Sequence, residues 1–364
     1  MKLLPAIRRV SRAREFAIFL FLLAVYLLLF ILKPQFRDPD KQLMVVRQFS
    51  WIAITAVGMT MVIITAGIDL SVGSVLALAA CSMGKIVELG TMVNMSVGVA
   101  MAIAIGPVCG FLLVRYRIKA FWAVAAGVLI GGACGFLLLV YPVWAAVGLG
   151  LVVGAACGLL NGLAVTKLRI PPFIATLGMM GMARGMTYVI TKGWYKNLPQ
   201  HFVKFLGEGE ALRVPVPVWI MAAVAVGGSI LLRHTTTGRY IYAIGGNEEA
   251  ARLSGIKVDR VKLAVYSLTG FLAALAGMIV AARSGSAQPT AGVGSELSVI
   301  AAVIVGGTSL MGGEGSVLGT VIGAAILGII PCGLILFRFP AEWEYVAVGG
   351  VIIIAVALDQ LKKR

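Results

Sequence analysis

The chain has 364 residues, of which 60% are hydrophobic and only 13% are charged, with a formal net charge of +16. Ordinary soluble domains contain roughly 45–50% apolar residues, so this composition excludes a soluble globular protein. Most basic residues stand in short segments between apolar runs, which indicates membrane topology rather than nucleic-acid binding.

Apolar runs of about twenty residues recur along the chain, each long enough to cross roughly 30 Å of hydrocarbon as a helix. Because lipid offers no hydrogen-bond partners, such runs must form helices or be sheltered by them. The sequence therefore predicts an all-α polytopic bundle of about ten to twelve transmembrane helices, some of them broken at Gly-rich points. The expected crossings lie near residues 15–32, 48–66, 71–88, 96–114, 120–140, 143–165, 173–190, 217–232, 263–282, 297–310, 317–337 and 345–358.

The first crossing follows a basic segment, residues 1–14, which contains four arginines. This run is too long for a signal peptide and lacks a small-residue cleavage pattern, so we expect it to remain as a span. Lys167 and Arg169, the basic loop 233–262 and the tail 362–364 fall on alternate connections. The positive-inside rule then places both termini in the cytoplasm and predicts one transmembrane domain over residues 15–361.

A polar interruption separates the second and third crossings, where Asp69 and Ser71 stand between glycines. A carboxylate is costly in lipid, so it should face protein or water. One interpretation is a discontinuous helix that lines a substrate path, with Ser71 free to bond a polar solute. The other is that Asp69 and Ser71 cap the start of the next helix.

Two internal similarities raise the possibility of repeats. Residues 110–121 match residues 162–173 at a constant offset, and residues 73–76 match residues 315–318. A duplicated hairpin would explain the first match, whereas small-residue packing would also produce the second.

A second Gly-rich region covers residues 296–315. Its glycines permit either close helix packing or an unwound helix near the translocation path. No lysine follows them in the order of a phosphate-binding loop, so this chain is not expected to bind ATP. The five cysteines fall inside apolar runs without the spacing of metal ligands, which favours packing roles and predicts no metal site.

The loop 233–262 contains a short segment with the signals of a capped helix. Asn247 is a candidate N-cap, Glu248 and Glu249 follow in the first turn, and Gly255 is a stop signal. Helices shorter than about 12–15 residues are marginal in water, so this one needs a surface to lie on. That surface is either the membrane or a partner protein.

The sequence from Glu249 to Gly255 resembles the EAA loop of bacterial ATP-binding-cassette (ABC) importer permeases, in which a short cytoplasmic helix inserts into the ATPase subunit. Residues 66–74, 168–177, 238–247, 287–292 and 305–310 are similar to the ribose and xylose type of permease. The resemblance covers nearly the whole chain from residue 48 onward. Residues 96–140 depart from it and indicate an extra hydrophobic hairpin.

The resemblance implies a type II-like importer permease in a bacterial cytoplasmic membrane, working as a homodimer with a cytoplasmic ATP-binding subunit and an extracytoplasmic sugar-binding protein. ATP and Mg²⁺ would bind the partner ATPase, and this chain would have no catalytic residue. Permeases for branched-chain amino acids or nucleosides are the alternative. An ion-coupled secondary transporter is less favoured because no paired carboxylates or basic relays are found inside the apolar runs.

The residues expected to act fall into two sets. The ATPase-coupling set comprises Asn247, Glu248, Glu249, Ala250, Ala251, Arg252, Leu253, Ser254 and Gly255. The substrate-path set, chosen as polar residues beside apolar runs, comprises Asp69, Ser71, Asn161, Thr176, Gln288 and Glu296.

Overall fold

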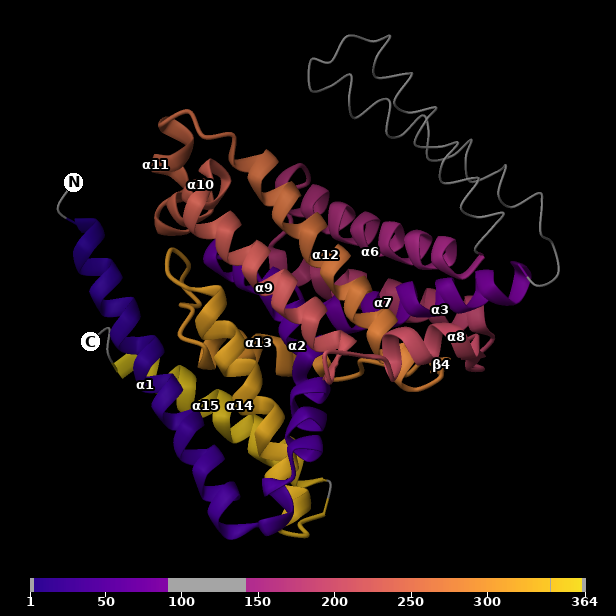
Figure 1. Ribbon diagram of the computed structural model, residues 1–364. Helices are drawn as coiled ribbons and strands as arrows, with labels where there is room; N and C mark the ends of the chain where they lie inside the picture. The colour runs from indigo at the N-terminus through magenta and orange to yellow at the C-terminus, as the bar shows by residue number, and fades with distance from the viewer. Residues whose placement is uncertain (1–2, 91–141, 341, 362–364) are drawn as a thin grey trace.

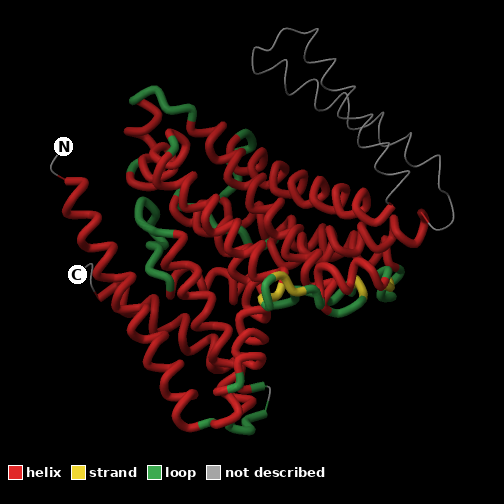
Figure 2. The backbone as a smooth tube through the Cα atoms, viewed as in Figure 1, coloured by secondary structure: helices red, strands yellow, loops and turns green. Residues whose placement is uncertain are grey.

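The computed structural model describes residues 3–90, 142–340 and 342–361 (Figure 1). The expected hairpin 96–140, and with it the first of the two internal matches, lies outside the described residues. Most of the described backbone is helical, and Figure 2 shows loops and very short strands between the helices.

The helices follow the apolar runs in order. Before the gap they are α1 Leu3–Leu32, the 3₁₀ turn η1 Pro34–Arg37, α2 Pro39–Ile64 and α3 Val72–Gly90. After it come α6 Pro142–Thr166, α7 Pro172–Thr191, α9 Val216–His234, α10 Thr236–Gly246, α11 Glu248–Leu253, α12 Val258–Arg283, α13 Ser295–Val305, α14 Val317–Leu336 and α15 Trp343–Leu361.

Short elements connect α7 to α9. They are β1 Lys196–Asn197, α8 Gln200–Phe202, the π-helical turn η2 Val203–Gly207, β2 Glu210–Ala211 and β3 Val214–Pro215. β1 pairs antiparallel with β4 Ser286–Ala287, which follows α12, and β2 pairs with β3. We call this region the β4 end of the bundle and the opposite region, around α10 and α11, the α11 end (Figure 1).

Seven of the described helices are long and apolar enough to cross a membrane. They confirm the crossings expected near 48–66, 71–88, 143–165, 173–190, 217–232, 263–282 and 317–337. The first helix includes residues 3–14 as well as the apolar run that follows them. α2 lies in the interior and contacts α9, α12, α13 and α14, and most of its apolar span is buried.

The crossing expected near 297–310 is not a full span. α13 has 11 residues, which is about 16 Å at 1.5 Å per residue and half of the hydrocarbon thickness. The chain before it, between β4 and α13, is not helical and contains Gly292 and Gly294 with positive φ. This crossing is therefore a broken one, as the Gly-rich pattern allowed.

Close backbone contact holds the long helices together. α6 and α12 approach so closely that a Cβ added at Gly158 would lie 2.2 Å from the carbonyl oxygen of Tyr266. Small residues at such positions let membrane helices gain packing contacts that larger side chains would prevent.

The two segments of the second internal match, residues 73–76 and 315–318, lie at different positions relative to their helices. Gly73 lies inside α3, which begins at Val72, whereas Gly315 precedes α14 and Ser316 is the N-cap of that helix. The similar residues thus occupy different positions relative to the start of each helix.

Candidate functional site

The predicted coupling helix forms as α11, between the expected cap Asn247 and the expected stop Gly255. The side chain of Asn247 accepts a hydrogen bond from the amide of Ala250 at 2.9 Å, which confirms the N-cap. Ser254 is the C-cap, and Gly255 has a φ of +83° that an L side chain rarely adopts. Local signals alone therefore predict where this helix begins and ends.

Ion pairs and one buried side chain attach α11 to the first turns of α12. Glu248 pairs with Lys262 at 2.6 Å and Arg252 pairs with Asp259 at 3.5 Å, while Ala251 is buried. Burial of Glu248 opposes ionisation, but its hydrogen bonds to Lys262 and Arg252 outweigh that effect and lower its pKa. The helix thus has the supporting surface that its length requires, within its own chain.

The opposite side of α11 is bare. Leu253 is 85% exposed, and Glu249 is exposed beside it. Leu253 and Glu249 are therefore accessible from outside the chain, and a docking role for them stays a prediction.

Four of the six expected substrate-path residues are brought together at the break between α2 and α3. Asp69 Oδ1 accepts hydrogen bonds from the amide of Ser71 at 2.8 Å and from its hydroxyl at 2.6 Å. Asn161 Nδ2, on α6, donates to Ser71 Oγ at 2.9 Å. Thr176 Oγ1, on α7, donates to the carbonyl oxygen of Ile68 at 3.3 Å.

This cluster is closed. Its four side chains are at most 1% exposed and satisfy one another or nearby backbone groups. Asp69 binds the amide of Ser71, the residue that precedes α3, rather than an amide of the helix itself, so the capping interpretation stays a prediction. A role for these residues in contacting a solute stays a prediction.

The other two expected residues lie elsewhere, on the broken crossing. Gln288 is exposed and Glu296 is half-buried in the first turn of α13. Glu296 lies against the start of α3, since a Cβ added at Gly73 would be 2.6 Å from its carboxylate. The six residues therefore form two groups rather than one site.

Arg184, absent from the predicted set, connects to the second group. It lies on α7 and its Nη1 donates to the carbonyl oxygens of Pro289 at 2.6 Å and Ala291 at 2.9 Å. An arginine inside an apolar run was the signal that marked it, because such a charge is rare in lipid and needs partners. The identity of the partners depends on packing between α7 and a segment more than a hundred residues away.

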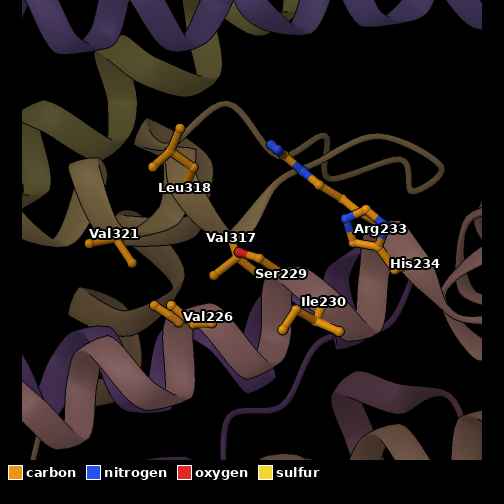
Figure 3. A pocket seen from close by; sticks show the side chains of 9 residues that line it. Val226, Ser229, Ile230, Arg233, His234, Val317, Leu318 and Val321 are labelled. Atoms are coloured by element: carbon orange, nitrogen blue, oxygen red, sulfur yellow. The ribbon is translucent and has the colours of Figure 1, made fainter.

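A shallow groove between α9 and α14 lies near the α11 end. Figure 3 shows Arg233 and His234 together at one end of it and aliphatic side chains along its walls. Val226, Ile230 and Leu318 are more than half exposed there, as expected for a surface that faces lipid. None of the predicted site residues lines this groove.

Among the residues that the structure describes, no group of three or more His, Cys, Asp or Glu side chains is placed to hold a metal ion. The two histidines are far apart, since His201 lies in α8 at the β4 end and His234 ends α9 at the α11 end.

Comparison with known proteins gives consistent matches. The family model "Branched-chain amino acid transport system / permease component" matches residues 41–140 and 122–356. The ribose import permease protein RbsC of Escherichia coli (strain K12) is 42% identical over 346 residues, which is 94% of this chain and 92% of that protein. RbsC of Bacillus subtilis (strain 168) is 41% identical over the same shares.

A third relative matches over a shorter region. The L-arabinose transport system permease protein AraH of Escherichia coli (strain K12) is 40% identical over 222 residues, 61% of this chain and 68% of that protein. No solved structure matches the chain.

Proposed function

The chain belongs to the family of branched-chain amino acid transport system permease components, and on that premise we propose that it is the membrane-spanning subunit of an ABC importer for a monosaccharide. The observation that carries this proposal is the 42% identity to a ribose import permease over nearly the full length of both chains. Relatives named for xylose and arabinose support the same substrate class. They favour a sugar over the amino acid in the family description.

The energy source would be a separate ATP-binding subunit that docks on α11. The capped helix, its attachment to α12 and its exposed Leu253 support this role. ATP and Mg²⁺ would bind that partner, and a sugar-binding protein would deliver the solute. The permease would alternate between two global conformations. A ligand that binds one conformation more tightly than the other would shift the population toward it.

The α11 end would face the cytoplasm of a bacterial inner membrane. Lys167 pairs with Asp259 at 3.4 Å, so the basic loop after α6 lies beside the coupling loop. Positive charges of two connections gather at one end, as the positive-inside rule expects for the cytoplasmic side. Both termini would lie on that side.

A second copy of the chain would complete the pathway. α7 is apolar, yet most of its length is exposed, and a Cβ added at Gly178, Gly181 or Gly185 would meet nothing within 4 Å. A helix face of glycines between apolar residues favours close contact with another helix in a membrane.

Uptake in proteoliposomes tests the proposal. The chain is reconstituted with the ATP-binding subunit and the binding protein encoded beside it, and uptake of labelled D-ribose, D-xylose, L-arabinose and L-leucine is compared. We expect ATP-dependent uptake of one of the sugars and none of leucine. Uptake of leucine without any sugar would replace the monosaccharide by the alternative cargo.

A further inference from the structure

The non-helical segment between β4 and α13 lies beside the middle of α7. Arg184 is about 18 Å from the start of α7 at 1.5 Å per residue, so the carbonyl groups that it binds are also deep in the bundle. Irregular backbone at such depth is tolerated only where protein or water satisfies its polar groups. Each polar backbone group of this segment therefore requires a hydrogen-bond partner.

From Gln288 to Gly292, the carbonyl groups of the segment divide into two alternating sets. Those of Gln288, Thr290 and Gly292 accept bonds from backbone amides three residues ahead, at 3.1 to 3.3 Å. Those of Pro289 and Ala291 accept from the guanidinium of Arg184. One side chain thus supplies the donors for both carbonyl groups of the second set.

Charged and exposed side chains also lie along or beside this segment. The carboxylate of Glu296 is close enough to Arg184 for Coulombic attraction, and it lies against the start of α3. Gln288, Thr290 and Val293 are exposed along the segment. Arg184 consequently fixes the backbone from which these groups project.

We propose that Arg184 is the positioning residue of the sugar path: it holds the segment 288–294 at mid-bundle and keeps Gln288, Thr290 and Glu296 on the route of the sugar. This inference rests on the proposed function. A neutral side chain in place of Arg184 leaves two carbonyl groups without their donors and lets the segment move. A lysine keeps the charge and one or more donors on a flexible stem, so it should restore part of the effect.

The first test measures transport by the reconstituted transporter. We expect Arg184→Gln to lower the maximal rate of sugar uptake by at least about tenfold, because the loss of even one of the two hydrogen bonds from the charged donor corresponds to about that factor. Arg184→Lys should fall between Arg184→Gln and the parent chain. The sugar concentration for half-maximal uptake should stay unchanged, because the binding protein sets it. Lys192→Asn is the control, since it removes a positive charge from the end of the same helix.

The second test measures the position of the segment without any transport. All native cysteines are replaced, Thr290→Cys is introduced, and its labelling by a membrane-impermeant maleimide is followed in cells. We expect Arg184→Gln to change the labelling rate several-fold, Arg184→Lys to change it less, and Lys192→Asn to leave it as it is. The amount of chain in the membrane is measured for each variant.

The outcomes separate the two proposals. If the parent transporter carries no sugar but labelling responds to Arg184→Gln as expected, the proposed cargo is wrong while Arg184 still positions the segment. If Arg184→Gln matches Lys192→Asn in labelling and uptake, Arg184 has no positioning role. If the Arg184→Gln variant does not accumulate in the membrane, the test depends on Arg184→Lys. Labelling and uptake by the Arg184→Lys variant that equal those of the parent chain would overturn the proposal.

Discussion

Glu249 is the exposed side chain of α11 on which the predicted docking of the ATP-binding subunit is tested. It lies in the first turn of α11, beside an asparagine cap and away from the ion pairs that attach the helix to α12. Its neighbour Glu248 is held by Lys262 and Arg252, so two adjacent acids face different surroundings. Of these two acids, Glu249 is the one that forms no ion pair with the residues that the structure describes.

Glu249→Arg should leave the chain in the membrane but uncouple it from its ATPase. Reversal of a charge at a protein contact is expected to weaken docking by about 2 kcal/mol, or about thirtyfold. Copurification with the ATP-binding subunit and sugar uptake measure the loss. Glu210→Arg, at the β4 end, is the matched control. Docking and uptake that both survive Glu249→Arg would remove the role assigned to this residue.

The pH dependence of α11 follows from Glu248. Its pKa is lowered from 4.5, so the contribution of its ion pairs is complete above that value and is lost as the pH falls through the lowered pKa. Lys262→Gln removes one cause of the lowered pKa of Glu248. The α11 amides should then lose their protection from hydrogen exchange at a higher pH than in the parent chain. Hydrogen exchange of the α11 amides over an acid titration measures this. Equal midpoints in the two chains would exclude the Lys262 pair as the cause.

At the scale of elements, the turn from α11 to α12 depends on one backbone conformation. Gly255 has a φ of +83°, whereas proline is restricted to about −65°. Gly255→Pro therefore cannot keep this turn and should displace α11 from its position on α12.

We expect Gly255→Pro to abolish copurification with the ATPase while the chain stays in the membrane. A strained residue costs about 1–3 kcal/mol, which a short helix with few contacts cannot absorb. Gly246→Ala is the control, because a Cβ there would meet nothing within 4 Å. A docked and active Gly255→Pro transporter would show that the position of α11 is not what couples the subunits.

The broken crossing is the second element whose form matters. α13 is long enough for about half of the hydrocarbon thickness. The carbonyl groups of the segment before it accept hydrogen bonds from backbone amides and from Arg184. The Gly-rich composition of residues 296–315 allowed either close helix packing or an unwound helix, and it did not locate the non-helical segment at 288–294. Only the packed arrangement shows that the loop half faces α7.

On the scale of the whole molecule, close helix packing decides stability. Gly158→Leu would force side-chain atoms into the backbone of α12, where the carbonyl oxygen of Tyr266 is 2.2 Å from the position of a Cβ. Overpacking of this kind costs about 1–3 kcal/mol, so the melting temperature in detergent should fall by several degrees. Gly148→Leu, on the same helix but with open space, should have little effect. Equal melting temperatures would show that α6 and α12 do not depend on this contact.

The sequence by itself determined the membrane setting, the positions of most helices and the whole of α11. These properties depend on runs of apolar residues and on bonds between near neighbours, such as Asn247 to Ala250. Resemblance to sugar permeases, also a property of the sequence, determined the class of function. The hairpin 96–140 and the orientation of the termini stay predictions.

The tertiary structure alone decided which polar residues act together. Asn161 and Ser71 are 90 residues apart, and Arg184 and Pro289 are 105 apart, yet each pair is joined by a hydrogen bond. Such pairs depend on how closely and at what angle helices pack, which glycines such as Gly158 permit but do not specify. For this reason the six expected path residues divided into a closed cluster and a group on the broken crossing, and the partners of Arg184 entered only with the structure.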